Sequence, residues 1–329
     1  MIRNKKILVT GGAGFIGSNL VELLLKYDNK VTVLDNFSTG RRENLEEFSG
    51  NENFVLIEGD IRDYDICLES CRNQDFVLHQ AALGSVPRSI KDPVTTNDVN
   101  IGGFVKMLYA AVECKVQRFV YAASSSAYGD SSELPKVEDR IGKPLSPYAV
   151  TKYVNEVYAE NFHNIDGIDC IGLRYFNVFG KRQSPDGAYA AVIPKFACAL
   201  MKKESPVING DGSYSRDFTY IDNVLQANVL ALETENAAAL NQVYNVACGS
   251  SASLNELFEA LRENLGKFVP EILAIEAVHG PNRTGDIPHS LADISKIRRL
   301  LKYEPEKQFA EGIQLAAEYY FNLYNSERR

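Results

Sequence analysis

Two residues one helical turn apart, Tyr148 and Lys152, stand out in the stretch SPYAVTK at positions 146–152. Side chains four residues apart lie on the same face of an α-helix. An ordinary tyrosine, with a pKa near 10, is ionised to only about one part in a thousand at pH 7. A lysine ammonium beside it would lower that pKa, and a shift of about three units corresponds to ~4 kcal/mol. The pair is therefore suited to proton transfer, provided that other elements place it in a binding site.

A second group of residues is suited to binding a phosphate. The strand-like run KKILVT leads into VTGGAGFIGS, which places Gly11, Gly14 and Gly17 where a strand gives way to a helix. Glycines there let the backbone turn tightly and approach a pyrophosphate at the helix N-terminus. Asp35 ends the next strand-like run, 18 residues beyond Gly17. Its carboxylate can accept hydrogen bonds from an adenosine ribose and would repel a 2′-phosphate, so the pattern predicts NAD rather than NADP.

Short apolar runs alternate with amphipathic helical patterns in the first half of the chain. The helical pattern is clearest in GSNLVELLLKY, where Leu20, Leu23 and Leu24 line one face. This alternation predicts an α/β fold, a Rossmann-type doubly wound parallel sheet whose strands are buried on both faces. From about residue 180 the pattern loosens, and a smaller α/β lobe with helices at IPKFACALMKK and SLNELFEALRENLG is expected over the carboxyl edge of the sheet. The strand-like runs are KKILVT, NKVTVLD, NFVLIEGD, DFVLHQAA, QRFVYAASS and DCIGLRYF.

Composition limits the classes of function. The chain has 329 residues, of which 45% are hydrophobic and 24% charged, with a net charge of −8 and no long basic run. A nucleic-acid or membrane-surface role is disfavoured, because both need clustered Lys and Arg. The N-terminus shows no signal-peptide pattern, and no apolar run approaches the ~18 residues of a membrane span. We expect a cytoplasmic protein.

The cysteines and histidines do not indicate a metal site. Six cysteines are scattered through apolar or helical contexts, as in a cytosolic chain with reduced thiols. Cys67 and Cys71 have helical spacing, but no second Cys or His pair accompanies them. The four histidines show no metal-binding spacing either. We predict no bound metal.

Several motifs in order resemble one protein family. They are the glycine spacing, HQAA after the fourth strand, SSSAYG after the fifth, YxxxK at the next helix and RTGD near the C-terminus. Over essentially the whole chain they resemble the extended short-chain dehydrogenase/reductases, and within that family the UDP-hexose 4-epimerases, especially those acting on UDP-N-acetylhexosamines. The resemblance implies an NAD-binding domain at residues 1–179, with returning segments around 218–248. Residues 180–329 would then mainly form the lobe that binds the UDP-sugar.

The resemblance also implies a mechanism. Tyr148 corresponds to the family's catalytic base, and Lys152 to the residue that holds the nicotinamide ribose and lowers the pKa of the phenol. The sugar 4-hydroxyl would lose its proton to Tyr148 and a hydride to the nicotinamide. The 4-keto sugar would then rotate and take the hydride back on its other face. Asn100, in DVNIGG, resembles a residue that helps to seat Lys152, although an Asn at that place can also be a simple helix cap.

The resemblance implies that the catalytic hydroxyl comes from the run Ser124, Ser125 and Ser126. The hydroxyl would bridge the sugar 4-oxygen to Tyr148. Counting back four residues from Tyr128 selects Ser124, whereas alignment of the far end of the run selects Ser126. We rank Ser124 first and Ser125 second.

The remaining site residues follow from the resemblance. Asp60 and Ile61 would border the adenine. Arg216 and Arg283 would neutralise the substrate diphosphate, since a guanidinium fork suits paired oxygens. Asp286 resembles a ribose ligand. Other cofactor contacts are expected from Phe15, Ile16, Asn36, Gln80, Ala81, Ala82 and Tyr175, and other contacts to the nucleotide-sugar from Asn177, Val192 and Asn209.

Substrate choice depends on fewer positions. Ser290 stands where galactose-restricted epimerases carry a bulky tyrosine, and a small side chain leaves space for an N-acetyl group. Gly84, Ser85 and Arg88, in ALGSVPRS, are expected on the other side of the sugar. The resemblance therefore implies interconversion of UDP-GlcNAc and UDP-GalNAc, with weaker use of UDP-Glc and UDP-Gal.

Other functions remain as alternatives. The related 4,6-dehydratases and decarboxylases carry acidic residues beside the catalytic hydroxyl, where this chain has Ser125 and Ser126. UDP-glucuronate 4-epimerase is a nearer alternative, because Arg88 could meet a C6 carboxylate. A regulator that only senses nucleotide commonly loses the Tyr or the Lys, whereas this chain keeps both. A homodimer is expected by analogy, through the helix at NDVNIGGFVKMLYAAVEC and the helix that follows Tyr148.

Overall fold

The computed structural model describes residues 1–185, 191–281 and 287–326. Its main feature is a seven-stranded parallel sheet in the order β11-β6-β5-β4-β1-β2-β3. The order reverses direction at β1, which lies between β4 and β2. The predicted α/β class and doubly wound sheet are thus confirmed. The strands are β1 (Lys6–Thr10), β2 (Lys30–Asp35), β3 (Phe54–Glu58), β4 (Phe76–His79), β5 (Arg118–Ser124), β6 (Asp169–Tyr175) and β11 (Gln242–Val246).

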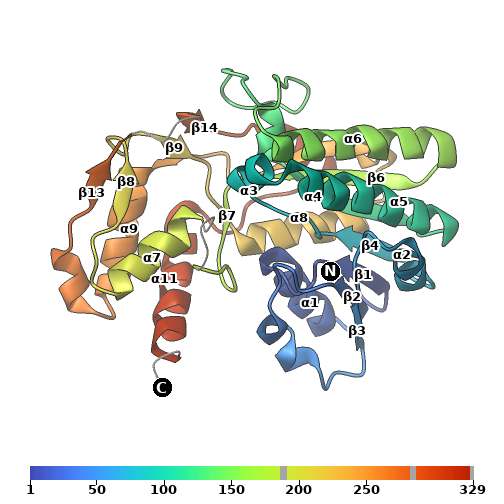
Figure 1. Cartoon of the computed structure of the whole chain (residues 1–329), viewed down its shortest axis with the longest axis horizontal. Coiled ribbons are helices and arrows are strands. Elements are labelled where there is room, and N and C mark those ends of the chain that lie inside the picture. The colour runs from blue at the N-terminus through green and yellow to red at the C-terminus, as the bar shows by residue number, and fades with distance from the viewer. Residues whose placement is uncertain (186–190, 282–286, 327–329) are drawn as a thin grey trace.

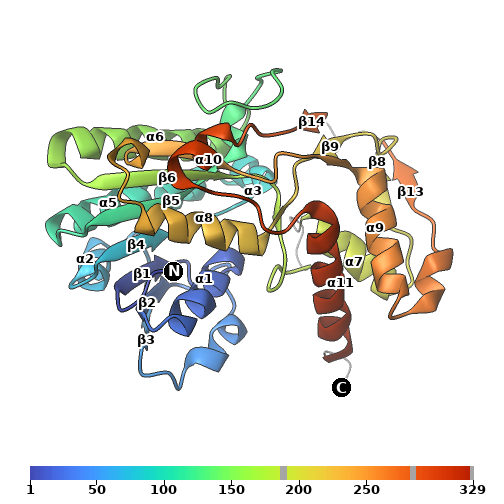
Figure 2. The same cartoon turned by 180° about the vertical axis from the view of Figure 1, so that it is seen from behind.

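Helices cover both faces of this sheet. Figure 1 shows α5 and α6 on one side of the strands, and Figure 2 shows α8 and α10 on the other. The first face is covered by α2 (Tyr64–Cys71), α3 (Val86–Lys91), α4 (Pro93–Asn97), the π-helical turn η3 (Asp98–Gly103), α5 (Phe104–Glu113) and α6 (Pro147–Asp166). The opposite face is covered by α1 (Phe15–Lys26), α8 (Ile221–Glu233) and α10 (Ser295–Leu301).

The core follows from the alternation of side chains along each strand. In β1, Ile7 and Val9 join the cluster on the α1 side, whereas Leu8 joins the cluster on the α5 side. All three are fully buried, as expected of a strand covered on both faces. The edge strand β3 differs, because Val55 and Leu56 are 52% and 39% exposed. The expectation that all six predicted strands are buried on both faces is therefore wrong for β3.

A second lobe lies beside the carboxyl edge of the sheet (Figure 1). Its apolar core is continuous with the cluster on the α1 side of the sheet, through residues such as Phe179, Phe196 and Leu261. Its helices are α7 (Val192–Met201), α9 (Leu254–Gly266) and α11 (Phe309–Ser326). Its strands are β8 (Val207–Asn209), β9 (Ser215–Arg216), β12 (Ala252–Ser253), β13 (Val278–Gly280) and β14 (His289–Ser290). Two short strands, β7 (Val178–Phe179) and β10 (Thr219–Tyr220), pair where the chain passes between the lobes.

Two broader features concern the described residues only. None of their helices is long and apolar enough to cross a bilayer. They also contain no cluster of three or more His, Cys, Asp or Glu side chains that could hold a metal ion.

Candidate active site

A pocket of about 560 Å³ opens at the carboxyl edge of the sheet. It lies where strand order reverses, which is the usual ligand site of doubly wound sheets. Residues at the ends of β1, β2, β4 and β5 line it, together with α6 and the chain after β7. The structure brings together in its walls the predicted residues Gly11, Gly14, Phe15, Ile16, Gly17, Asp35, Asn36, Asp60, Ile61, Gln80, Ala81, Ala82, Gly84, Arg88, Ser124, Tyr148, Lys152 and Tyr175.

The glycine loop leaves room for backbone only. Gly11 has a φ of +67°, and a Cβ there would lie 2.7 Å from the backbone N of Ala81. A Cβ on Gly17 would lie 2.1 Å from the carbonyl oxygen of Gly11. Gly14 is the N-cap of α1, so the first turn of this helix directs N–H groups without helical acceptors at the pocket. This cradle fits a diphosphate.

Asp35 is fixed beside the loop at the end of β2. One carboxylate oxygen accepts the backbone N–H of Ala13 at 2.9 Å and the other that of Phe37 at 2.8 Å. Burial raises the pKa of this carboxyl group, and the two backbone hydrogen bonds partly offset that effect. The carboxylate has further lone pairs on the pocket side, where it can accept ribose hydroxyls.

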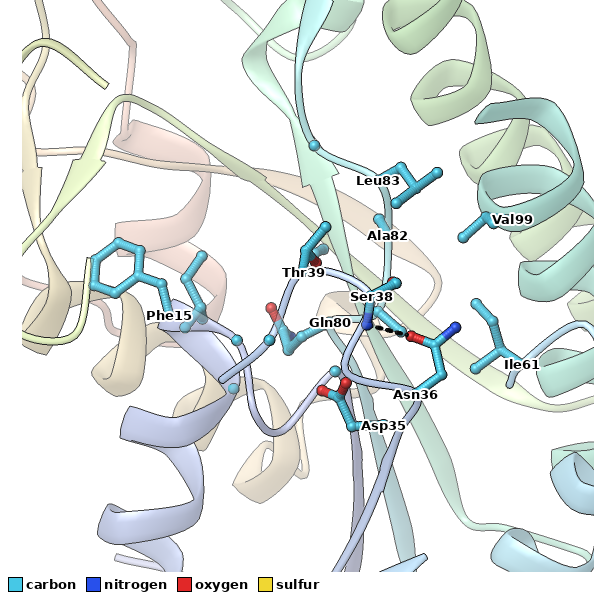
Figure 3. A pocket seen from close by; sticks show the side chains of 18 of the residues that line it. Phe15, Asp35, Asn36, Ser38, Thr39, Ile61, Gln80, Ala82, Leu83 and Val99 are labelled. Atoms are coloured by element: carbon cyan, nitrogen blue, oxygen red, sulfur yellow. Dashed lines mark hydrogen bonds between the residues drawn. The ribbon is translucent and has the colours of Figure 1, made fainter. Parts of the chain in front are cut away.

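Asn36 and Asp60 are hydrogen-bonded to each other at the far end of the pocket. The Asn36 amide donates to Asp60 Oδ2 at 2.8 Å, and Arg62 pairs with the same carboxylate at 2.7 Å. The hydrogen bond from Arg62 is the main reason why the pKa of Asp60 falls to about 2. Ile61 and Val99 add apolar surface beside this group, as Figure 3 shows. An apolar wall next to these polar side chains suits a flat base.

Ser124 lies close enough to Tyr148 to lower the pKa of the phenol, against the larger effect of burial. It is 9% exposed and lines the pocket, and Ser126 donates a hydrogen bond to its Oγ at 2.9 Å. Ser125 and Ser126 are not among the residues that line the pocket. Of the three serines considered, the structure therefore places Ser124 against the phenol.

The expected lowering of the Tyr148 pKa is not present in the protein chain by itself. Burial raises the pKa of this phenol, and the hydrogen bond with Ser124 offsets only part of the rise. Lys152 Nζ instead donates to the carbonyl oxygen of Ala122 at 2.7 Å. Burial lowers the pKa of Lys152 to about 8, while the charge of Glu156 raises it. The low dielectric that surrounds both groups disfavours their charged forms, which explains why these pKa values differ from the expectation. Helical spacing, on which the expectation was based, carries no information about desolvation.

Asn100 lies behind the pocket wall within the π-helical turn η3. Its amide oxygen accepts the backbone N–H of Leu83 at 2.8 Å, and its amide nitrogen donates to Thr151 Oγ1 at 3.1 Å. It is 2% exposed and does not line the pocket. The structure thus places it against the residue before Lys152 and against pocket residue Leu83, rather than in contact with the cofactor space.

Tyr175 and Gln80 of the pocket wall are hydrogen-bonded to each other, and Tyr175 is also hydrogen-bonded to Asn228, a residue that the sequence did not indicate. The Tyr175 hydroxyl donates to Gln80 Oε1 at 3.2 Å and accepts from Asn228 Nδ2 at 2.9 Å. Asn228 comes from α8 and is fully buried. Its position in the middle of an amphipathic helix gave no signal, because the contact spans 53 residues of sequence.

The other predicted substrate residues that the structure describes lie outside the pocket walls. In the parallel pairing of β14 with β9, Ser290 is the partner of Arg216. Asn177 donates to the backbone oxygen of Asp217 at 3.0 Å, which ties it to the same strand region. Ser85 caps α3 through the N–H of Arg88 at 3.1 Å. Val192 begins α7 and Asn209 ends β8, while Arg283 and Asp286 lie outside the described residues.

Sequence reasoning missed several residues that line the pocket. Ser38, Thr39 and Gly40 begin three residues after Asp35, and this small, polar turn after a strand end was a usable signal. No local pattern marked the residues that reach the pocket from the start of the second lobe. The missed residues are Leu34, Ser38, Thr39, Gly40, Gly59, Leu83, Val99, Ala122, Ala123, Val178, Gln183, Ser184 and Ala191.

Comparison with known proteins agrees with this geometry. The model of the NAD dependent epimerase/dehydratase family matches residues 7–247. A solved UDP-N-acetylglucosamine 4-epimerase from Methanobrevibacter ruminantium M1, in complex with UDP-N-acetylmuramic acid, is 40% identical with a TM-score of 0.91, covering 98% of this chain and 100% of that one. The UDP-glucose 4-epimerase of Thermotoga maritima, solved with UDP-glucose, is 36% identical with a TM-score of 0.89, covering 97% and 99%.

A relative known by sequence gives the same result. The UDP-glucose 4-epimerase of Mycolicibacterium smegmatis is 36% identical over 319 residues, which are 96% of this chain and 99% of that protein. NAD is the cofactor of the family, and the glycine cradle and Asp35 fit its diphosphate and adenosine ribose. The chain belongs to the NAD-dependent epimerase/dehydratase family and is an NAD-dependent UDP-sugar 4-epimerase.

Proposed function

We propose that this protein interconverts UDP-GlcNAc and UDP-GalNAc, and that it acts more slowly on UDP-Glc and UDP-Gal. The observation that carries the reaction is that Tyr148, Lys152 and Ser124 line one pocket, with Ser124 close enough to the phenol to lower its pKa. When bound, NAD supplies a hydride acceptor and donor for sugar C4 and a positively charged ring near the phenol. Each proton step falls to the side chains of this chain.

In this proposal Tyr148 removes the proton of the sugar 4-hydroxyl and later returns it to the opposite epimer. Ser124 holds the 4-oxygen within reach, because its hydroxyl can donate to the sugar while it stays hydrogen-bonded to the phenol. The Lys152 ammonium stabilises the phenolate. Since burial raises the pKa of Tyr148 in the chain alone, most of the opposing shift has to come from the positive charges of the assembled complex.

Selectivity for the N-acetyl group is assigned to Ser290 and Gly84. Ser290 is partly buried in β14, and a tyrosine in that position would fill the space that we assign to the C2 substituent. Gly84 lines the pocket beside the reacting groups, and a Cβ there would meet no atom within 4 Å. The 40% identity with a UDP-N-acetylglucosamine 4-epimerase supports this assignment, and the 36% identity with UDP-glucose 4-epimerases is the reason to test it.

UDP-glucuronate 4-epimerase is the second candidate function. Arg88 lines the pocket and carries the positive charge that a C6 carboxylate would need. Dehydration or decarboxylation is less favoured, because the residues that follow Ser124 are serines and supply no carboxylate.

The test is to incubate the purified protein separately with UDP-GlcNAc, UDP-Glc and UDP-GlcA and to identify the products by NMR. The proposal expects UDP-GalNAc to form faster than UDP-Gal, with no product from UDP-GlcA. Ser290→Tyr should slow the N-acetylated substrate more than the plain hexose. Equal slowing of both would contradict the pocket assignment, and a galacturonate product would select the second candidate.

We also propose a homodimer that pairs α5 and α6 with their copies. Val150 and Val157 of α6 are 44% and 49% exposed, and Tyr109 of α5 is 45% exposed. Seven residues separate the two valines, so they lie on one face of the helix. Large apolar side chains exposed along two packed helices favour burial against a second copy.

A further inference from the structure

Helix α6 carries a third ionisable residue in line with the catalytic pair. Tyr148, Lys152 and Glu156 follow at intervals of four residues, so all three lie on one face of the helix. Lys152 is 3% exposed and Glu156 is 8% exposed. Glu156 does not line the pocket, and no step proposed above uses it. A carboxylate in so dry an environment needs a compensating partner.

That partner is Arg174 of β6. Its Nε donates to Glu156 Oε1 at 2.8 Å and its Nη2 to Glu156 Oε2 at 2.7 Å. Arg174 is 3% exposed, and its Nη1 donates to the backbone oxygen of Glu138 at 2.9 Å. Its guanidinium also lies 4.8 Å from the centroid of the Tyr128 ring. These contacts hold the carboxylate in one orientation, one helical turn beyond Lys152.

A buried ion pair of this kind is a poor source of stability, because desolvation opposes its attraction. An electrostatic role toward Lys152 accounts for it better. Burial lowers the pKa of Lys152, and the charge of Glu156 opposes that effect. The charge of Lys152 in turn acts on His79, and those of Glu156 and Arg174 act on Tyr121. The titratable groups that interact with the pair or with Lys152 from neighbouring segments are His79 of β4, Tyr121 of β5, and Tyr128 and the buried Glu138 beside Arg174.

We infer that Glu156 and Arg174 are positioning residues for the epimerase reaction, in which the Glu156 carboxylate keeps Lys152 protonated inside the pocket and Arg174 sets how strongly it does so. This inference rests on the proposed roles of Tyr148 and Lys152. It predicts that the two partners act on the same property of the enzyme with opposite sign. If the pair only held β6 against α6, replacing either partner would not change that property in opposite directions.

The test is the pH dependence of kcat, measured on whichever UDP-hexose the parent protein epimerises best. Glu156→Gln leaves the Arg174 cation uncompensated near Lys152. The alkaline limb of the profile of kcat against pH should therefore move to lower pH by about one unit. Arg174→Gln leaves the carboxylate uncompensated, so the limb should move to higher pH. The double variant removes both charges, and its limb should return toward that of the parent. Glu160→Gln is the matched control, because it removes an exposed carboxylate one turn further along the same helix and should leave the limb in place.

A second readout does not need turnover. The pKa of Lys152 lies below its ordinary value in the folded protein, so burial of the ammonium costs stability at low pH and the cost disappears as the amine deprotonates. Glu156→Gln lowers that pKa further and increases the cost. Its deficit in unfolding free energy relative to the parent should therefore shrink as pH rises through about 7 to 8. A purely structural deficit would stay constant over that range.

The inference is overturned if all variants keep the parental limb and a constant stability deficit, or if both single variants shift the limb in the same direction. If Glu156→Gln does not fold, Glu156→Asp keeps the charge but withdraws it by one methylene. Its limb should then move to lower pH by a smaller amount, and an unmoved limb would overturn the inference. A parent protein without epimerase activity would instead contradict the proposed function, so the two failures are distinguishable.

Discussion

In the proposed mechanism Tyr148 loses and regains a proton in each turnover, yet the pocket in which it lies opposes its ionised form. Burial raises the pKa of the phenol, and the hydrogen bond with Ser124 works in the other direction. Ser124 therefore has two uses: it favours the phenolate, and it can hold the sugar oxygen. At the scale of single residues, the chemistry depends on which serine makes this contact.

A matched pair of variants tests that contact. Ser124→Ala removes the hydroxyl that meets Tyr148 and should lower kcat by about 10²-fold, in the range for loss of one positioned donor. Ser125→Ala removes a hydroxyl that does not line the pocket and should stay close to the parent. Initial rates of epimerisation give both values. A larger loss from Ser125→Ala would transfer the catalytic role to that residue.

The sequence predicted the placement of Tyr148 and Lys152 better than their protonation. Helical spacing was sufficient to put Tyr148 and Lys152 on one face of α6. Their pKa values depend on desolvation and on contacts with Ser124 and Ala122, which belong to strand β5. No local pattern in the sequence reports burial of that kind, so the sequence did not indicate that the chain alone raises the pKa of Tyr148.

At the scale of elements, the turn between β1 and α1 determines whether a dinucleotide can approach. Gly17→Ala would force a Cβ to within 2.1 Å of the Gly11 carbonyl oxygen. We expect it to destabilise the fold by about 1–3 kcal/mol and to lower retention of NAD. Gly50→Ala is the control, because a Cβ at Gly50 meets no atom within 4 Å. Thermal unfolding and the NAD content after gel filtration check both variants, and retention of NAD equal to the parent in Gly17→Ala would contradict the assigned role of the loop.

The strands and the first helix follow directly from local patterns, whereas two elements do not. β1 to β6 were predicted because each is a short apolar run between turns or helices. The π-helical turn η3 inserts Asn100 into the wall behind Lys152, and such a turn has no characteristic spacing of apolar residues. The exposure of β3 was missed because an edge position depends on strand order, which is a property of the sheet.

For the whole molecule, a buried neutral histidine sets a limit on acid stability. His79 is 3% exposed, with the Thr10 hydroxyl 2.9 Å from its Nδ1, and burial lowers its pKa to about 3. The pKa of His79 is lower in the folded protein than the unfolded value near 6.5, so protonation favours the unfolded state. The contribution of the neutral histidine to the unfolding free energy is therefore fully present above pH 6.5 and is lost as pH falls toward 3. The loss is on the order of 5 kcal/mol.

His79→Phe should therefore flatten the fall in unfolding free energy between pH 6.5 and pH 4, as measured by urea titration. His279→Asn changes an exposed histidine and should leave the parental pH dependence intact. An unchanged slope in His79→Phe would contradict the account of this residue.

Assembly is the second property of the whole molecule that can be tested. Val157→Glu places a charge on the exposed apolar face of α6 and should convert the proposed dimer to a monomer, since burying an unpaired charge is costly. Val278→Glu changes an equally exposed valine on β13 of the second lobe and should leave the dimer intact. Sedimentation velocity at micromolar concentration separates the two states. A parent protein that sediments as a monomer would remove the dimer proposal.

The division of the chain between lobes shows the limit of sequence reasoning at this scale. Returning segments were expected around 218–248, and α8 and β11 do pack on the main sheet. The second-lobe residues Gln183 and Ser184 reach the pocket across the boundary, and nothing in their local sequence marked them. Contacts of this kind depend on how one lobe lies against the other, so they required the structure.

The most direct test of the account follows a deuterium label at C4 of UDP-GlcNAc during turnover in ordinary water. If Tyr148 handles only the hydroxyl proton while the C–H bond is broken and remade within the closed site, UDP-GalNAc should form with the deuterium still at C4, as seen by NMR. Tyr148→Phe should bind NAD as the parent does and form product at least about 10²-fold more slowly. Loss of the label to water, or a Phe variant as fast as the parent, would contradict the account.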